Sequence, residues 1–132
     1  MIIEIIISEL DFYLIERVRE LRIKFGLSQV ALAHKVGVSE GYFGKVENLK
    51  QPGKYNIRML SRIATALELV SYSDLFPQKI FSNDLVKIKI QLLTKREILD
   101  TGSKSGEIQE RLKILSITPL SEKEIMKFDK RS

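Results

Sequence analysis

The chain offers few residues for bond-making chemistry. His34 is its single histidine and it has no cysteine, so the usual histidine and thiolate ligands of a zinc site cannot be assembled. The serines have no evident base partner, and neither a phosphate-binding loop nor a dinucleotide-binding motif occurs. We therefore expect no catalysis, no cofactor and no metal, and we expect His34 to face solvent from a helix.

Side chains that hydrogen-bond or carry charge gather instead in residues 29–55. Lys45 could donate to O6 or N7 of guanine, and Glu40 could accept from N4 of cytosine. The Gln29 amide and the exposed N–H groups at a helix start could bind an anionic oxygen. The other candidates in this stretch are Ser39, Gly41, Tyr42, Lys50, Lys54 and Tyr55.

Two short helices across a tight turn would position these side chains. Leu32 and Val36 share one face of a first helix, because they are four residues apart. Phe43 and Val46 are three apart and share one face of a second helix. The pattern predicts that both faces pack against one core.

The turn between the two helices has its own signals. Gly37 can take the left-handed conformation that closes a helix. Ser39 would then cap the next helix with its side-chain oxygen. Ala33 is small enough to let the two helices approach closely.

This stretch resembles the DNA-binding motif of the phage-repressor and Cro type, the Xre family of regulators. Residues 15–29 resemble the first helix of the family and its Gly-Leu-Ser-Gln entry into the second. Residues 56–69 and 72–76 resemble its fourth and fifth helices. The resemblance implies a mainly α fold, with a five-helix lambda-repressor-like DNA-binding domain over residues 8–77. A small α+β extension over residues 78–132 would follow it.

The resemblance also implies roles for the candidate residues. The second motif helix, at about residues 40–48, would lie in the major groove with its first residues towards the base edges. Base-reading positions would be Glu40, Gly41 and Lys45, Gln29 would be the phosphate anchor, and Tyr42 would face outwards towards the DNA. Glu40 could instead be only a charge favoured at a helix start, and Gly41 either lets the backbone approach DNA or reads little sequence.

The loop after the second motif helix places Lys50, Lys54 and Tyr55 where they could contact phosphates. The alternative is a solvated loop, which would also carry lysines.

Arg22 and Glu47 occupy positions where the family often pairs an arginine late in the first helix with a glutamate ending the third. We expect a structural ion pair. The alternative is that Arg22 contacts a phosphate.

Capping residues and apolar spacing indicate the remaining helices. Ser8 and Asp11 resemble a capping pair for a helix that ends near Phe25. Ser28 would cap the second helix, Asn56 a fourth helix, and Ser71 with Asp74 a short fifth one. The core stripe expected on the fourth helix consists of Ile57, Leu60, Ile63, Ala64 and Leu67.

The remaining segments indicate strands and one more helix. Residues 86–92 alternate apolar and polar side chains, which predicts a strand. Residues 100–106 indicate a loop, and residues 107–117 fit either a helix or a strand, of which we favour the strand. A turn would begin at Thr118-Pro119, and Ser121 with Glu124 would cap a helix through Phe128. Residues 1–7 are either a strand or disordered.

Net charge and hydropathy limit the kinds of partner that the chain could have. The net charge is +5 and the pI about 9.5, which suits a polyanion without identifying one. Residues 9–77 have ten basic and eight acidic side chains, net +2, whereas residues 78–132 have twelve and eight, net +4. The apolar opening is too short to span a membrane and lacks the basic start of a signal peptide, so we expect a cytoplasmic protein.

The resemblance implies a sequence-specific DNA-binding transcription regulator, usually a repressor. We expect a homodimer that binds double-stranded DNA and associates through residues 78–132. One alternative is an antitoxin whose residues after Pro77 bind a toxin. Another is a protein-interaction module without DNA binding.

Overall fold

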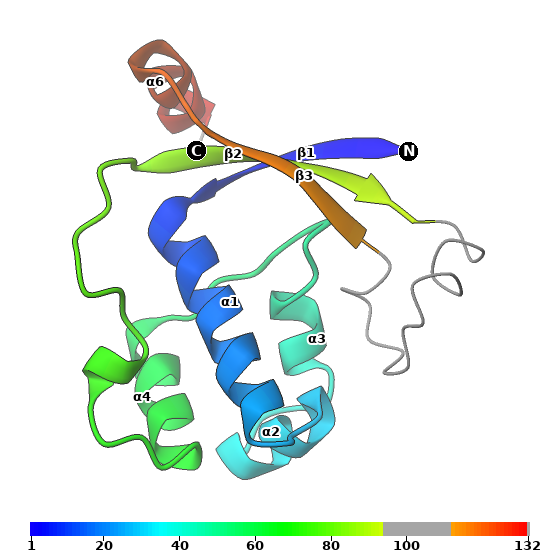
Figure 1. The fold of residues 1–132 in the computed structure, drawn as a ribbon, viewed down its shortest axis with the longest axis vertical. Coiled ribbons are helices and arrows are strands. Elements are labelled where there is room, and N and C mark those ends of the chain that lie inside the picture. Colours follow the sequence, from blue (N-terminus) through cyan, green and yellow to red (C-terminus); the bar gives the residue numbers. More distant parts are fainter. Residues whose placement is uncertain (94–111, 132) are drawn as a thin grey trace. The chain divides into compact units, whose positions relative to one another are not determined.

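The computed structural model describes residues 1–93 and 112–131 (Figure 1). The chain forms two compact units. One consists of residues 11–80, and the other combines residues 1–10 with residues 81–132. The first is helical, and the second is built on a sheet.

The helical unit has the predicted order of helices. They are α1 (Glu9–Lys24), α2 (Gln29–Val36), α3 (Tyr42–Val46), α4 (Ile57–Ala66) and the short 3-10 helix η1 (Tyr72–Asp74). Their apolar faces form one core, whose fully buried members include Ile15, Val18, Leu32, Phe43, Ile63 and Leu75. The five-helix arrangement is therefore confirmed, with a 3-10 turn as its fifth member.

Local backbone signals in this unit act as predicted. Gly37 ends α2 with a φ of 87°, in the left-handed region where glycine has no Cβ clash. The Ser28 hydroxyl accepts from the Ala31 amide at 3.0 Å, and Asn56 Oδ1 accepts from the Met59 amide at 2.7 Å. Each side chain satisfies one of the N–H groups that a helix start leaves without an intrahelical partner.

Two predictions about the helices α3 and α4 are wrong. Ser39 does not cap α3: the helix starts only at Tyr42, and Gly41, which has no side chain, takes the capping position. The Tyr42 amide donates to the Ser39 carbonyl at 3.1 Å instead, so residues 39–42 form a turn before the helix. Ile57 is 87% exposed rather than in the core, because the buried stripe of α4 begins only at Met59.

The sheet has three antiparallel strands in the order β1 (Ile2–Ser8), β2 (Leu85–Leu92) and β3 (Leu112–Pro119). The predicted strand at residues 86–92 is confirmed, and the opening residues are its edge partner. Strand rather than helix is also correct for residues 112–117. Thr118-Pro119 ends this strand and does not begin a turn. The predicted loop at residues 100–106 and residues 107–111 lie outside the described residues.

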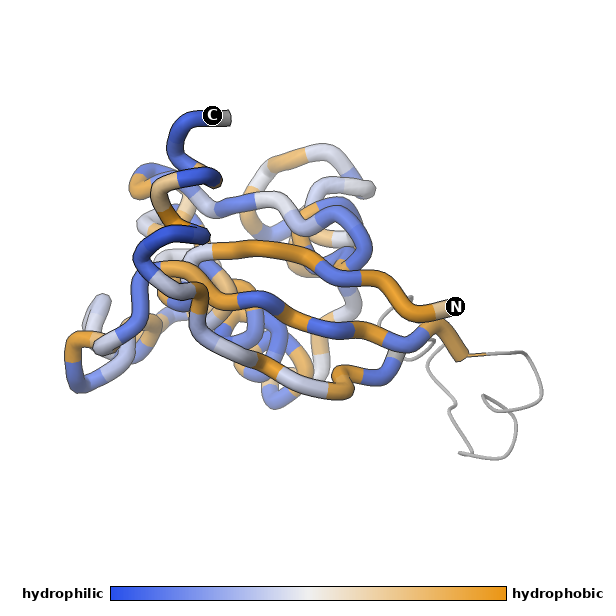
Figure 2. The backbone as a smooth tube through the Cα atoms, turned by 90° about the horizontal axis from the view of Figure 1, so that it is seen from above, coloured by the Kyte–Doolittle hydropathy of each residue, from blue (hydrophilic) through white to orange (hydrophobic). Residues whose placement is uncertain are grey.

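The hydropathy of successive residues alternates along β2, as the changing colours show (Figure 2). Because successive side chains of a strand point to opposite faces, this alternation gives the sheet one apolar and one polar face. Ile88 pairs with Ile5 and Ile117 on the apolar face. On the other face Lys87 lies 4.0 Å from a Glu4 carboxylate oxygen, and so does Lys89. This period of two is what the sequence between residues 86 and 92 predicts.

Helix α6 (Glu122–Arg131) follows β3. Its start carries the predicted reciprocal cap: the Ser121 amide donates to Glu124 at 3.1 Å and the Glu124 amide donates to the Ser121 hydroxyl at 3.3 Å. Both bonds, with one from Lys87, lower the pKa of the Glu124 carboxyl. The helix continues three residues beyond the predicted end at Phe128.

Candidate nucleic-acid interface

Helices α2 and α3 meet across a short link and approach each other closely (Figure 1). Leu32, Ala33 and Phe43 are fully buried between them and their neighbours. A Cβ on Gly44 would lie only 3.3 Å from Gln29 Oε1, so α3 runs close to the start of α2. This is the packing expected of two motif helices with small residues at their crossing.

A buried ion pair connects the ends of α1 and α3. Arg22 Nη2 donates to Glu47 Oε1 at 2.9 Å, and Arg22 Nε donates to Glu47 Oε2 at 3.2 Å. Both residues are 1% exposed, and Arg22 Nη1 also donates to the Leu27 carbonyl at 2.9 Å. The predicted structural pair is confirmed, and the alternative phosphate contact for Arg22 is wrong because its guanidinium is inside the unit.

Gln29 contributes to the same cluster. Its Nε2 donates to Glu47 Oε1 at 3.3 Å, so the first residue of α2 contacts the residue that caps α3. Sequence reasoning did not find this bond, because nothing in an eighteen-residue separation marks it. The predicted role of Gln29 at a phosphate stays a prediction.

The candidate base-reading residues lie at the surface. Glu40, Gly41 and Lys45 are exposed, and so is Ser39. Glu40 and Gly41 precede the first turn of α3, and Lys45 is in its last turn.

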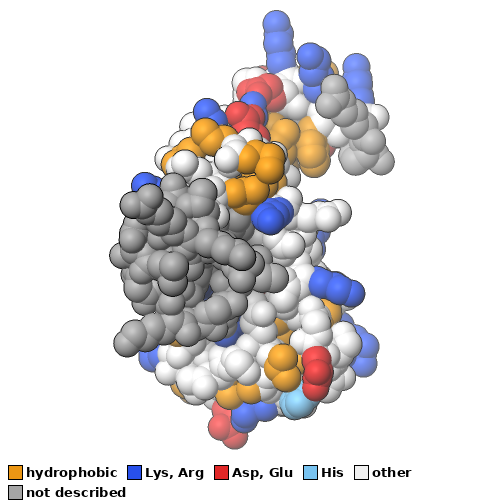
Figure 3. Space-filling view, turned by 90° about the vertical axis from the view of Figure 1, so that its right-hand side faces the viewer, with side chains coloured by type: hydrophobic (Ala, Val, Ile, Leu, Met, Phe, Trp, Pro, Cys, Tyr) orange, Lys and Arg blue, Asp and Glu red, His pale blue; other side chains and the backbone are white. Residues whose placement is uncertain are grey.

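Glu40 has a partner that the sequence did not suggest. His34 Nε2 donates to Glu40 Oε1 at 2.9 Å, from the last turn of α2 to the turn before α3. The two side chains are 62% and 69% exposed. The expectation that His34 faces solvent is confirmed. Figure 3 shows the histidine beside an acidic side chain.

Tyr42 is less exposed than predicted. It is half-buried, and its ring meets that of Phe43 edge to face with centroids 5.1 Å apart and planes at 89°. Burial raises the pKa of the Tyr42 hydroxyl, while the positive charge of Arg62 acts in the opposite direction. Tyr42 is therefore partly a packing residue.

Tyr55 does not lie where a phosphate contact needs it. It is 7% exposed, its ring centroid is 6.1 Å from that of Phe43, and its hydroxyl is buried without a partner among the described residues. Burial raises the pKa of Tyr55 far above its usual range; Glu47 and Tyr42 act in the same direction, and Arg22 opposes them. The prediction for this residue is wrong, because the loop returns its ring to the core.

The loop after α3 presents its two lysines. Asn48 Oδ1 accepts from the Lys50 amide at 3.0 Å, and the Gly53 amide donates to the Val46 carbonyl at 3.3 Å. Lys50 and Lys54 are both exposed. Bonds at both ends of the loop hold these cations next to α3.

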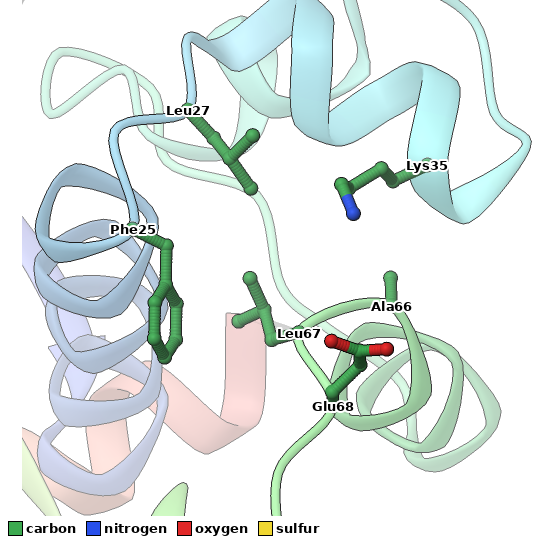
Figure 4. Close-up of a pocket in the computed structure, with 6 residues that line it drawn as sticks. All are labelled: Phe25, Leu27, Lys35, Ala66, Leu67 and Glu68. Carbon is green, nitrogen blue, oxygen red and sulfur yellow. The ribbon is translucent and has the colours of Figure 1, made fainter.

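A shallow pocket of about 160 Å³ lies elsewhere in the helical unit (Figure 4). It is lined by Phe25, Leu27, Lys35, Ala66, Leu67 and Glu68. Lys35 and Glu68 are its only charged groups, and Glu68 has a left-handed φ of 55° just after α4. It contains no nucleophile with a base beside it.

Within residues 1–93 and 112–131, no three acidic or histidine side chains come together as metal ligands. No helix in the same ranges has the length and apolar character needed to cross a membrane.

Two comparisons with known proteins found a similarity to this chain. Residues 18–75 match a helix-turn-helix family. A solved structure described as a hypothetical transcription factor NHTF from Neisseria is 27% identical, with a TM-score of 0.46, and the match covers 53% of this chain and 78% of that one. No curated protein matches the chain.

Proposed function

Because residues 18–75 form a helix-turn-helix domain of the Xre or lambda-repressor-like family, we propose that this DNA-binding regulator reads sequence by inserting α3 into the major groove. The observation that carries the proposal is the cluster that fixes α3. Arg22 and Gln29 hold Glu47 at its end, while Glu40 and Lys45 stay exposed.

Rigid support matters because α3 is short. It spans five residues, which is too few to be stable alone, so its orientation comes from packing and from the bonds to Glu47. A reading helix that rotates freely would lose the geometry that base hydrogen bonds require. A buried, multiply bonded Glu47 supplies that constraint.

The proposed contacts divide by role. Glu40, Gly41 and Lys45 face base edges, and Tyr42 contributes its exposed edge to the same surface. Phosphate contacts come from Gln29, Ser39, Lys50 and Lys54. This division gives base contacts the selectivity and phosphate contacts the register.

We also propose that the protein represses as a homodimer that associates through the sheet unit. β3 is an edge strand, and three of its apolar side chains are exposed: Ile114 by 38%, Leu115 by 40% and Ile117 by 48%. A free edge beside apolar side chains favours pairing with another strand. The same observation keeps the antitoxin reading as a second candidate, with a toxin at β3 in place of a second copy.

Binding-site selection with the full chain tests the proposal. We expect enrichment of a sequence with two related half-sites about one helical turn, or ~34 Å, apart. A single enriched half-site would contradict the dimer. A folded protein that enriches no sequence would contradict base reading and leave a protein-interaction module without DNA binding.

A further inference from the structure

The hydrogen bond between His34 and Glu40 lies at the edge of the proposed DNA surface. Both side chains are more than 60% exposed, and Glu40 lies two residues before the first residue of α3. An exposed pair of this kind contributes little to stability. Its position beside the helix that meets DNA suggests a role in binding.

The bond restricts what the imidazole can do. A carboxylate only accepts, so Nε2 of His34 must be the donor to Glu40. In the neutral ring the other nitrogen then has no proton and can only accept. A neutral His34 held by Glu40 therefore meets a phosphate oxygen with a lone pair, whereas a protonated His34 bridges Glu40 and the phosphate with two N–H groups.

The charge of the pair also favours a protonated His34 in the DNA complex. The pair has a net charge of −1 with a neutral imidazole and 0 with a protonated one, and DNA phosphates repel the first. Protonation also makes the bond to Glu40 charge-assisted on both sides, which strengthens it. The position of His34 in the last turn of α2, where the helix dipole favours a cation, adds to this preference.

Several charged and titratable side chains lie on the elements around His34. Lys35 is on α2 itself, Lys45 and Tyr42 are on α3, and Arg62 of α4 donates to the Val36 carbonyl at 2.8 Å. Glu68 follows α4 and faces the same pocket as Lys35. Imidazole is the one side-chain type whose ordinary titration falls between pH 5 and 8.

We propose that His34 is a phosphate contact of the DNA complex, that it takes up a proton when DNA binds, and that Glu40 is its acceptor. This inference rests on the proposed DNA binding. Glu40 then holds the imidazole of His34 in addition to any contact with a base. Binding should then strengthen as the pH falls, because the complex binds more protons than the free protein.

The test is the affinity of the full chain for a mixed-sequence duplex at low salt, measured at several values between pH 8 and pH 6. For the unchanged protein we expect affinity to rise on acidification, by at most about tenfold per pH unit for one proton. His34→Gln keeps a neutral donor to Glu40 and should bind with no pH dependence. His34→Lys, which is positive throughout, should bind at pH 8 nearly as tightly as the unchanged protein does at pH 6.

A matched pair of variants tests the role of Glu40. At pH 8 Glu40→Gln should bind the duplex more tightly, because it removes the repelling charge. Glu20→Gln removes the same charge from an exposed position on α1 and should have a smaller effect. Circular dichroism of each variant establishes that the domain stays folded.

The possible outcomes distinguish a failure of the His34 proposal from a failure of the proposed DNA binding. If the protein binds DNA and His34→Gln keeps the full pH dependence, the inference is wrong and DNA binding stands. If Glu40→Gln and Glu20→Gln change affinity equally, Glu40 is not the acceptor that matters. If the unchanged protein binds no duplex at any pH, the proposed function fails and this inference fails with it.

Discussion

At the residue scale, one buried glutamate organises the proposed reading surface. Glu47 accepts from Arg22 and Gln29 and thereby connects α1, α2 and α3. Burying two charges is costly, and such a pair is maintained because each partner compensates the other. Removing one charge alone therefore leaves the other buried without compensation, which is strongly destabilising.

We predict that Arg22→Ala lowers the free energy of unfolding by about 3–5 kcal/mol, because it leaves Glu47 buried without its main partner. Urea denaturation measures this. Glu20→Ala, which removes one member of an exposed pair, should cost less than about 1 kcal/mol. Similar losses of unfolding free energy in the two variants would mean that the buried pair stabilises the protein no more than the exposed pair does.

Tyr55 gives a prediction of the opposite sign. Its hydroxyl is buried without a partner among the described residues, so Tyr55→Phe should leave stability unchanged or raise it. Because burial raises the pKa of Tyr55, the unfolded chain loses this proton first, and stability should fall as the pH rises above about 10. The phenylalanine variant should lack that part of the decline. A loss of DNA affinity in this variant would restore Tyr55 to the binding surface.

Lys45 and Lys54 separate base reading from phosphate binding. Once an operator is known, Lys45→Ala should relax the preference at one base position, worth about 1–3 kcal/mol there. Lys54→Ala should weaken all sequences alike, because a phosphate contact carries no sequence information. Titrations against single-base operator variants decide between them, and uniform losses in both would rule out direct reading by Lys45.

Sequence reasoning placed residues well where a family resemblance or a local signal was available. Arg22 with Glu47 came from the resemblance, and the caps at Ser28 and Asn56 came from residue type at a helix start. Tyr55 was placed outside because the path of the loop decides its burial, and Ile57 was placed in the core although the buried stripe of α4 begins only at Met59. The contact of His34 with Glu40 depends on a turn geometry that periodicity does not encode.

At the element scale, periodicity predicted the helices and β2, whereas β1 and β3 were each one of two readings of their segments. Apolar side chains at helical spacing indicate an amphipathic helix that packs its apolar face on a core, so α1, α2 and α4 follow from the sequence. The order of the sheet did not follow, because β1 and β2 are separated by the whole helical unit. No local signal tells an opening apolar run which strand it will pair with.

The turn between α2 and α3 depends on Gly37. Its φ of 87° costs a residue with a Cβ about 1–2 kcal/mol. The added Cβ itself would make an ordinary contact with Arg62 Nη2 at 3.4 Å, so the cost comes from the backbone conformation. Gly37→Ala should therefore lower the melting temperature, and Gly37→Asn should lower it less, because asparagine tolerates this conformation. Equal stability of glycine and alanine variants would show that the turn relaxes.

At the scale of the whole molecule, association through the sheet unit is the proposal that most needs its own test. We expect Ile117→Lys, which places a charge among the exposed apolar side chains of β3, to shift the protein towards a monomer and weaken operator binding. Ile80→Lys makes the same change at a residue that is 99% exposed outside any helix or strand, and should leave both unchanged. Light scattering distinguishes the species. A dimeric Ile117→Lys protein would move the interface away from β3.

The most direct test of sequence-specific DNA binding is a titration of the full chain against its selected operator and a scrambled duplex over a series of salt concentrations. We predict that the operator binds at least ~1,000-fold more tightly than the scrambled duplex at physiological salt. Both affinities should fall with added salt, by about 0.9 in the log–log slope for each phosphate contact. Equal affinities for the two duplexes, or an interaction that salt does not weaken, would contradict the assignment of α3 as a reading helix.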